Sequence, residues 1–393
     1  MLFKKWISMG LIALVCAGLG FSFVGGAAQT PSTLKAGFIY VGPIGDAGWT
    51  KAHDDARLIA EQTFPWLETI FVESVPEGEE GAVIDRMINE EGVDVIFATS
   101  FGFMDGTLAK AAEYPDKFFF HATGFKRAPN MGTYMADFHQ LYYLDGLMAG
   151  ALTKTNKLGY VGAFPIPELK RHINAFTMGA RMVNPNAEVN IRWIFDWFNP
   201  AAAKEAAEAL IAEGVDGLAF TEDTATVLQV AQQNGIFGFS HYNPMFDFAP
   251  EATVSGQIVH WEAIYNDILS KIYTGIYTTE NLADVDYWWL LQDKAVELGG
   301  RIGVPIEPAY ADALKAKIVN HPQFGEISVY DLVLKLRDQA ADPEVVFSPF
   351  TGPISDRKGN LRVPDGVRLG VHDLTTMEWA VEGVVGAWPG EPE

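Results

Sequence analysis

The segment LKAGFIYV, residues 34–41, runs directly into GPIGDAGW, residues 42–49, and this junction decides the fold. The first segment is a nearly continuous apolar run, which is typical of a central parallel strand covered by helices on both faces. The second is a glycine-rich loop that leads into a predicted helix over about 48–64. A buried strand followed by a loop and a helix predicts the start of an α/β domain.

The same alternation runs outward from this junction in two rounds. In the first round, helices are predicted at 79–90, 103–114 and 139–152, and strands at 69–75, 93–100, 117–123 and 131–137. The second round starts at KLGYVG (157–162); its strands follow at 188–195, 217–221 and 236–241, and its helices at 167–183, 200–213 and 224–234. Strands separated by helices form parallel sheets, so two rounds predict two doubly wound domains.

The pattern becomes mixed after residue 253, where we expect the chain to weave back between the two domains. Strands are predicted at 253–259 and 287–291, helices after 259 and at 309–319 and 329–340, and a hairpin or loop at 350–363. We therefore expect an N-terminal lobe of residues 34–154 plus about 255–280. The C-terminal lobe would hold residues 155–250 plus about 283–345, and residues 346–393 would form a tail that packs across both lobes.

Residues 1–28 have the pattern of a secretory signal peptide. Lys4 and Lys5 precede an apolar run over 7–24, and cleavage is expected after Ala28. A retained membrane anchor is the alternative, because an apolar run of about 18 residues approaches spanning length. Lipoprotein anchoring through Cys16 is disfavoured, since Val15 stands where the peptidase needs a small residue. The mature protein is therefore expected outside the cytoplasm, in the periplasm or its equivalent.

Length and composition limit the possible domain count, protein class and binding partners. A chain of 393 residues suits two domains, and 49% hydrophobic with 20% charged residues excludes a disordered chain. Asp and Glu total 50 against 28 Lys and Arg, a net charge of −22, which argues against nucleic acid as a partner. Cys16 is the only cysteine, so disulfides, thiolate zinc sites and CxxC redox chemistry are excluded.

Motifs for catalysis or cofactor binding are absent from the sequence. Residues 42–48 have the spacing GxxGxxG rather than GxGxxG, and Asp46 would repel a pyrophosphate at the helix N-terminus. There is no P-loop, HExxH or GxSxG motif, and the eight histidines are scattered. We therefore predict no catalytic residue, no cofactor and no metal site.

Aromatic and polar side chains instead follow the predicted strands, where ligands bind in open α/β sheets. Flat rings with a few hydrogen-bonding groups suit a planar, polar heterocycle. For any single ring, core packing is the alternative, although it is less natural for Trp49 beside glycines and Trp197 before Asn199-Pro200. The predicted ligand-binding residues are Asp46, Trp49, Phe101, Phe164, Trp197, Asp223, Tyr242 and Asn243.

Several separated motifs carry a resemblance to a known family. They are GPIGDAGWTKAHD (42–54), TSFGFMDGTL (99–108), KLGYVGAFPIPELKRHINAFTMGAR (157–181), WFNPAAAKEAAEALIAEGVDGLAF (197–220), GPISDRKGNLRVP (352–364) and MEWAVEGVVG (377–386). In this order they resemble the basic membrane protein family, periplasmic substrate-binding components of ABC transporters related to purine nucleoside receptors. The resemblance implies a type I periplasmic binding protein, with two parallel-sheet domains joined by a multi-segment hinge.

The resemblance also implies roles for single residues. Trp49 and Trp197 stand where family members place the two rings that sandwich a purine. Asp46 matches an aspartate that contacts the purine edge, although capping of the helix near Gly48 is an equal alternative for it. Tyr242 and the stretch 258–259 replace the aspartate and lysine that grip ribose in the nucleoside receptors. A free nucleobase is therefore favoured over a nucleoside.

The expected function is that of a monomeric receptor that closes on a purine-like ligand and delivers it to an ABC permease. Closure would be a hinge motion in which each lobe supplies one stacking ring. One alternative is a sensory binding protein that reports to a membrane receptor. The other alternative is an exported α/β enzyme acting on nucleosides, which is supported only by the fold class.

Overall fold

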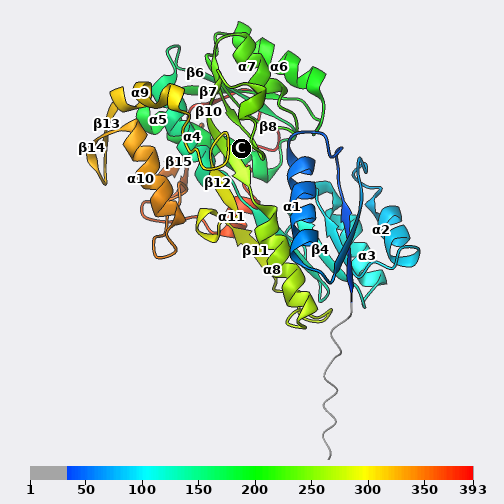
Figure 1. The fold of residues 1–393 in the computed structure, drawn as a ribbon. Helices are drawn as coiled ribbons and strands as arrows, with labels where there is room; N and C mark the ends of the chain where they lie inside the picture. Colours follow the sequence, from blue (N-terminus) through cyan, green and yellow to red (C-terminus); the bar gives the residue numbers. More distant parts are fainter. Residues whose placement is uncertain (1–32, 393) are drawn as a thin grey trace, which may run out of the picture.

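Two α/β lobes and a C-terminal tail make up the part of the chain that the structure describes (Figure 1). The computed structural model describes residues 33–392, so the predicted signal segment 1–28 lies outside the described residues. Within residues 33–392, no helix has the length and apolar character needed to cross a membrane.

The first lobe, blue and cyan in Figure 1 except for two segments from later in the chain that are yellow-green to yellow, is built on a six-stranded parallel sheet with the order β11-β5-β4-β3-β1-β2. Its strands are β1 (Leu34–Ile39), β2 (Leu67–Val72), β3 (Val95–Ala98), β4 (Phe118–Ala122), β5 (Met131–Ala136) and β11 (Asp286–Trp289). Its helices are α1 (Trp49–Thr63), α2 (Glu80–Asn89), η1 (Phe101–Phe103), α3 (Met104–Glu113) and α8 (Trp261–Tyr273), and α1 packs against α8. Strands β3 and β5 are buried along their whole length, as expected for strands covered on both faces.

The second lobe has a seven-stranded sheet with the order β12-β10-β9-β8-β6-β7-β17. All neighbours are parallel except β10 and β12. The strands are β6 (Lys157–Gly162), β7 (Glu188–Trp193), β8 (Gly217–Thr221), β9 (Phe237–Ser240), β10 (Thr253–Val259), β12 (Val296–Leu298) and β17 (Val384–Val385). The helices that accompany this sheet are α4 (His139–Leu152), α5 (Pro167–Val183), α6 (Pro200–Ala212), α7 (Thr226–Gln233), η2 (Phe246–Phe248), η3 (Leu291–Asp293), α9 (Pro308–Ala316) and α10 (Val329–Ala341).

Local sequence signals explain where several of these helices begin. Helix α6 has Pro200 at its first position, and the Asn199 side chain accepts a hydrogen bond from the Ala202 N–H at 3.0 Å. Helix α10 begins after Ser328, whose hydroxyl oxygen accepts from the Asp331 N–H at 3.1 Å. Both are N-caps that satisfy otherwise unpaired N–H groups of the first helical turn.

The chain passes between the lobes three times, at residues 137–138, at 260 and at 290–295. These crossings differ from the expected boundaries of 34–154 and about 255–280 for the first lobe. Helix α4 and strand β10 lie in the second lobe, whereas β11 joins the first sheet although residues 283–345 were assigned to the second lobe. The first lobe therefore holds residues 33–136, α8 and β11.

Close packing of two helices explains why α4 belongs to the second lobe. A Cβ on Gly146 of α4 would lie 2.1 Å from the Phe176 carbonyl oxygen of α5, and one on Gly179 of α5 would lie 2.1 Å from the Tyr143 carbonyl oxygen. Only glycine permits this backbone approach, so α4 is fixed against α5 rather than against the strand that precedes it.

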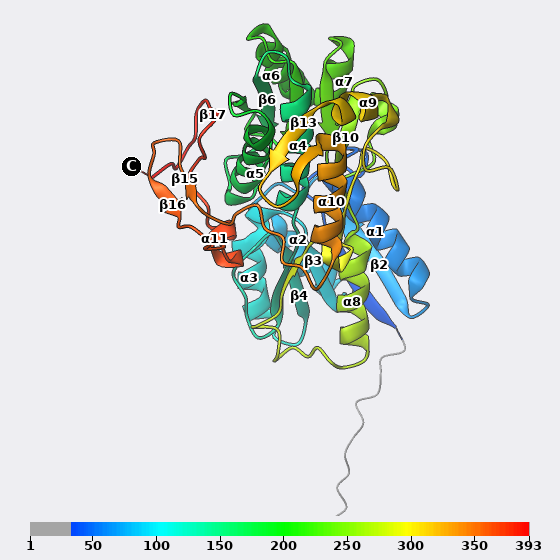
Figure 2. The ribbon, with the colours of Figure 1, turned by 90° about the vertical axis from the view of Figure 1, so that its left-hand side faces the viewer.

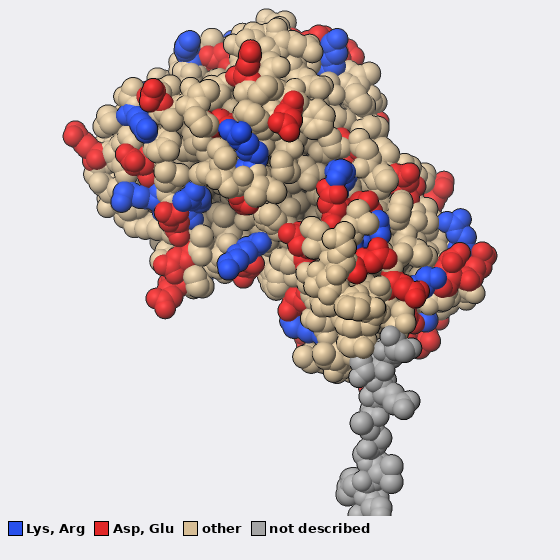
Figure 3. Space-filling view, viewed as in Figure 1, with Lys and Arg blue, Asp and Glu red and all other residues tan. Residues whose placement is uncertain are grey.

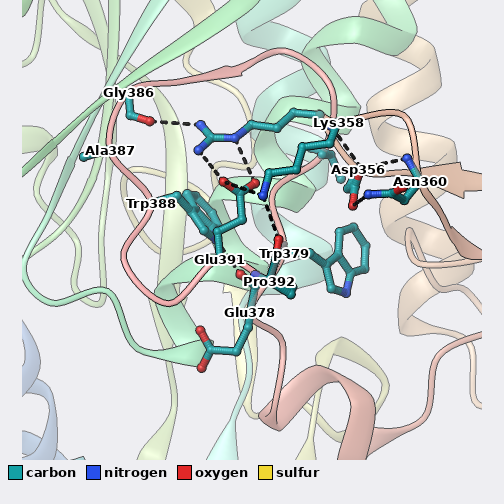
Figure 4. Close-up of polar contacts among 12 residues, drawn as sticks. Asp356, Lys358, Asn360, Glu378, Trp379, Gly386, Ala387, Trp388, Glu391 and Pro392 are labelled. Carbon is teal, nitrogen blue, oxygen red and sulfur yellow. Dashed lines mark hydrogen bonds and ion pairs between the residues drawn. The ribbon is translucent and has the colours of Figure 1, made fainter.

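The C-terminal tail, residues 346–392, lies along one side of the molecule (Figure 2). The tail contains the short paired strands β15 (Ile354–Ser355) and β16 (Leu361–Val363), the short helix α11 (Val371–Thr375) and strand β17. A separate hairpin, formed by β13 (Ile318–His321) and β14 (Gly325–Ser328), lies before α10 and outside the tail. The Arg357 guanidinium donates to both Glu391 oxygens at 2.9 and 2.7 Å and to the Gly386 carbonyl at 2.9 Å. Figure 4 shows these contacts together with the bond from Lys358 Nζ to the Pro392 carbonyl. The tail is therefore tied to itself and, through β17, to the second sheet.

Charged side chains are mixed over the face of the molecule seen in Figure 3. Acidic groups outnumber basic ones over the whole chain, and the face shown has no continuous basic patch. This face offers no electrostatic footprint for a phosphate backbone.

Candidate functional site

A cavity lies between the lobes, where the carboxyl ends of strands from both sheets meet. The lining side chains nearly fill it: the free space is about 10 Å³, roughly what a single water needs. Its walls come from the segments after β1, β3 and β4 on one side and after β6, β7, β8 and β9 on the other. The lining residues are Val41, Trp49, Ser100, Phe101, Thr123, Glu168, Trp197, Asp223 and Tyr242.

The first lobe supplies a packed aromatic wall. Trp49 is only 6% exposed, and its Nε1 donates to the Thr99 carbonyl oxygen at 2.6 Å. Its ring centroid lies 5.0 Å from that of Tyr242 and 5.2 Å from that of Trp261, both in edge-to-face geometry. These contacts leave the ring little freedom, so Trp49 is a fixed platform rather than a mobile side chain.

Asp46 has a capping role at the start of α1. One carboxylate oxygen accepts from the N–H groups of Gly48 and Lys51 at 2.8 and 3.0 Å, and the other accepts from Thr50 N–H at 2.8 Å. Burial raises the pKa of Asp46 to about 6, although these backbone donors oppose the shift. Asp46 does not line the cavity, so the capping alternative describes its position.

The second lobe supplies polar groups that lack partners. Asp223 is 1% exposed, and neither of its carboxylate oxygens has a hydrogen-bond partner within the described part of the chain. Glu168 Oε1 and Trp197 Nε1 are likewise buried and unpaired among residues 33–392. The backbone N–H of Asp223 donates to the Trp197 carbonyl oxygen at 2.8 Å, which holds the carboxyl and the indole in one unit. Buried polar groups without partners are costly, so this wall is suited to receive a ligand with complementary groups.

Burial shifts the pKa values of both acids of this wall upward, toward their neutral forms. Burial and the nearby Asp46, Glu222 and Glu168 carboxyls raise the pKa of Asp223 well above its usual range. Burial raises the pKa of Glu168 to about 7, against the opposing charge of Arg171. Acids without a counter-ion in a closed cavity shift in this direction because water no longer solvates their charge.

The lobes touch each other beside the cavity. A Cβ on Gly48 of the first lobe would lie 2.8 Å from the Asp223 Cα of the second lobe, so the two backbones are in direct contact. At the same contact between the lobes, Asn243 Nδ2 of the second lobe donates a hydrogen bond to the Gly48 carbonyl oxygen of the first at 2.7 Å. The structure is therefore a closed form, in which a ligand could enter only after the lobes separate.

Two lining residues adopt strained backbone conformations. Thr123 and Tyr242 both have φ of +63°, in the left-handed region that residues other than glycine avoid at a cost of about 1–2 kcal/mol. Both follow the ends of strands, β4 and β9, and the strain aims their side chains at the cavity. Strained residues of this kind gather at binding sites.

The structure brings together five of the eight residues predicted from sequence. Trp49, Phe101, Trp197, Asp223 and Tyr242 line the cavity. The other three lie around it. Asp46 caps α1, the Phe164 ring packs 5.2 Å from the Trp197 ring, and Asn243 bridges the lobes.

Four lining residues are not in the set of predicted ligand-binding residues: Val41, Ser100, Thr123 and Glu168. Thr123 was counted inside a strand that ends one residue earlier, at Ala122. Glu168 stands in the first turn of α5, one residue after Pro167, and was read only as part of a helix. A signal for Glu168 existed, since the loop after β6 lies at a ligand-binding edge and Pro167 fixes where the helix starts.

Comparison with known proteins identifies the family. The family described as "ABC transporter substrate-binding protein PnrA-like" (Bmp) matches residues 33–322. The chain belongs to this family. The predicted resemblance and the absence of an enzymatic role are confirmed, because the members are substrate-binding proteins of ABC transporters rather than enzymes. A PnrA-like protein of this kind works with a small-molecule ligand and a membrane permease, and acts outside the cytoplasm as ABC substrate-binding proteins generally do.

Two curated relatives cover most of this PnrA-like chain. The purine-binding protein of Brucella abortus is 34% identical over 373 residues, 94% of this chain and 98% of that protein. A putative ABC transporter glucose-binding protein of Haloferax volcanii is 39% identical over 292 residues, 74% of this chain and 73% of that protein. The names of these two relatives point to different ligands.

Solved structures confirm the predicted fold of two parallel-sheet lobes. A solute-binding protein of an ABC transporter from Aeropyrum pernix K1 superposes with a TM-score of 0.65 at 14% identity, covering 80% of this chain and 93% of that one. A second, from Conexibacter woesei, gives a TM-score of 0.60 at 19% identity over 81% and 99%. At such identities the likeness concerns the fold alone.

Metal binding has no candidate among residues 33–392, where no group of three or more His, Cys, Asp or Glu side chains could hold an ion. The cavity presents aromatic rings, hydroxyl groups and the two buried carboxyl groups of Glu168 and Asp223.

Proposed function

We propose that this PnrA-like protein captures a flat, purine-like heterocycle between its lobes and favours a nucleobase over a nucleoside. After export directed by residues 1–28, it acts as a monomer that delivers the ligand to its ABC permease. The observation that carries this proposal is the cavity wall around Asp223, whose two buried oxygens are unpaired beside the rings of Trp49 and Trp197.

Stacking supports a planar ligand. Each base–ring contact contributes about 1–3 kcal/mol, and hydrogen bonds to a buried acid add to it. Together they are sufficient for micromolar or tighter affinity. The relative from Brucella abortus, which spans nearly the whole chain, is named for purine binding.

The position of Tyr242 supports a nucleobase. Its ring lines the cavity and is 1% exposed, so it fills volume that a sugar would need. Ile258 and Val259 are buried in β10 and add no polar group. Asn243 is engaged with Gly48 across the contact between the lobes and is not free to hold a sugar hydroxyl in the closed form.

A hexose is the second candidate, because the Haloferax volcanii relative is named as a putative glucose-binding protein. Sugars also stack on tryptophan and hydrogen-bond to buried carboxyls. Sugars are not planar, however, so they match aromatic rings on two sides less well than a flat heterocycle does.

Calorimetric titration of ligand-free protein with adenine, adenosine, hypoxanthine, inosine and glucose tests the proposal. We expect both nucleobases to bind at least as tightly as their nucleosides, and glucose not to bind. A preference for both nucleosides of about tenfold, or 1.4 kcal/mol, would contradict the nucleobase assignment. Glucose binding without purine binding would contradict the purine-like class, and mass spectrometry of the ligand released on denaturation provides an independent check.

A further inference from the structure

Glu168 is a lining residue whose environment sets it apart from the other acids of the second lobe. Its side chain is 5% exposed, and its Oε1 is buried without a hydrogen-bond partner in the described chain. Arg171, one turn later on α5, does not pair with it. The guanidinium instead donates to Asp137 in the first crossing segment, with Nε 2.6 Å and Nη2 2.5 Å from Oδ2. Arg171, the cation that could have neutralised Glu168, is therefore paired with Asp137 in the crossing segment instead.

The remaining ionisable neighbours reinforce the neutral form of Glu168. Burial raises its pKa to about 7, Arg171 lowers it and Asp137 raises it. From the other elements around the cavity, Asp223 after β8 and the phenols of Tyr160 on β6 and Tyr242 after β9 interact with the same carboxyl. Of the groups named here, only Arg171 is positively charged; it lowers the pKa of Glu168 but is bound to Asp137 and forms no ion pair with Glu168.

A neutral carboxyl presents an O–H donor beside a C=O acceptor. An edge with a ring nitrogen next to an N–H group has the complementary pattern, and purine bases carry such edges. A carboxylate would present two acceptors and would repel the ring nitrogen. The protonation state of Glu168 therefore decides which ligand edge it can bind.

We propose that Glu168 determines specificity by acting as a neutral acid, donating its proton to a ring nitrogen of the ligand and accepting from the adjacent N–H. This inference rests on the proposed function and adds to it the hydrogen-bonding pattern of the ligand. A site built in this way rejects ligands that lack the paired donor and acceptor, because its own polar groups would remain unpaired.

The test compares adenine binding to wild type, Glu168→Gln and Glu168→Ala from about pH 5.5 to about pH 8.5, a range in which adenine stays neutral. Glutamine keeps an N–H donor beside a C=O acceptor and does not titrate. We expect wild-type affinity to fall roughly tenfold for each pH unit above the pKa of Glu168. We expect E168Q to stay within about threefold of the low-pH wild type at every pH, and E168A to be at least tenfold weaker throughout.

Controls separate Glu168 from the other acids that titrate nearby. Asp223→Asn and Asp46→Asn should keep the pH dependence, whereas E168Q should lose it. A flat wild-type profile, tighter binding at high pH, a pH dependence that survives in E168Q or one that disappears in Asp223→Asn would overturn the inference. If a variant folds poorly, the pH profile of wild-type affinity alone still tests the role of Glu168. A complete lack of adenine binding to wild type would overturn both the proposed function and this inference.

Discussion

The two walls of the cavity differ in how their polar groups are satisfied. On the first lobe, Trp49 Nε1 is bonded to Thr99, Asp46 is saturated by three backbone N–H groups, and the Ser100 hydroxyl donates to Glu77 at 2.6 Å. On the second lobe, Glu168, Trp197 and Asp223 all have buried polar atoms without partners among residues 33–392. Among the lining residues of the first lobe, only the Thr123 hydroxyl oxygen is buried without a partner within residues 33–392. The first wall therefore has most of its polar groups satisfied before a ligand arrives, whereas the second has three groups that a ligand could satisfy.

This contrast indicates that the two walls contribute differently to ligand binding. A wall with satisfied polar groups offers any flat ligand a surface for stacking, which is tolerant of chemical identity. A wall with unpaired groups penalises every ligand that leaves them unpaired. We therefore expect substitutions on the first lobe to change affinity for all flat ligands alike, and substitutions on the second lobe to change selectivity as well.

The largest effect is expected for Asp223→Ala. Removing both unpaired oxygens deletes the hydrogen bonds that a ligand would make to a buried acid, about 1.5–3 kcal/mol for each charged or strongly polarised contact. Adenine affinity should fall roughly 100-fold in calorimetry, with the melting temperature unchanged or raised. Asp105→Ala, at a carboxyl with 76% exposed side chain, is the matched control and should bind as wild type. Unchanged affinity in Asp223→Ala would remove the main difference between the two walls.

The stacking pair should lose about tenfold or more in affinity per ring, since each tryptophan supplies one face of about 1–3 kcal/mol. Trp197→Ala should leave the melting temperature close to that of wild type, because this side chain is only partly buried. Trp49→Ala should also lower the melting temperature, because the ring packs against Tyr242 and Trp261. Ligand quenching of tryptophan fluorescence reports both sites. Wild-type affinity in both variants would place the sandwich elsewhere.

Gly48→Ala tests whether the two walls must touch. The added Cβ would lie 2.8 Å from the Asp223 Cα, so the lobes should close incompletely and adenine affinity should fall several-fold. Small-angle scattering should show a smaller ligand-induced compaction than in wild type. Gly45→Ala is the matched control in the same loop, since a Cβ there meets nothing within 4 Å. Equal loss in both variants would assign the effect to loop flexibility instead of closure.

The smallest effect on binding is expected for Asp46→Ala. Loss of the cap should reduce the free energy of unfolding by about 1 kcal/mol while adenine affinity stays within about twofold. Thermal unfolding and calorimetry on the same sample measure both quantities. A loss of affinity at an unchanged melting temperature would show that the carboxylate contacts the ligand, and the first wall would then hold a recognition group of its own.

The sequence was sufficient for those parts of the site that depend on strand ends. Trp49, Phe101, Trp197, Asp223 and Tyr242 each follow a strand that apolar patterning reveals, and the carboxyl ends of parallel strands lie at one edge. The fold followed from the same alternation. The position of Glu168 after β6 could have been found in the same way, but its unpaired state could not, because it depends on Arg171 being bound to Asp137, a contact between residues 34 apart.

Two other features have equally specific causes. The sequence at 42–48 is compatible with a cap and with a ligand contact; three hydrogen bonds in space show the cap at Asp46, and its contact with a ligand stays a prediction. The lobe boundary was placed after α4 because a helix that follows a strand usually packs on the same sheet. The close contact between Gly146 and the Phe176 carbonyl instead fixes α4 against α5, and no local sequence pattern predicts this contact.

The position of β17 has a consequence for how the chain is made. Val384 and Val385 pair with β7, which would otherwise be the outer strand of the second sheet. An open edge of this kind is a template for pairing with another chain. Strand β17 comes after the other six strands of this sheet in chain order, so a chain truncated before residue 384 would leave the edge of β7 uncovered. Protection against pairing at this edge is therefore acquired only after the rest of the sheet has been synthesised.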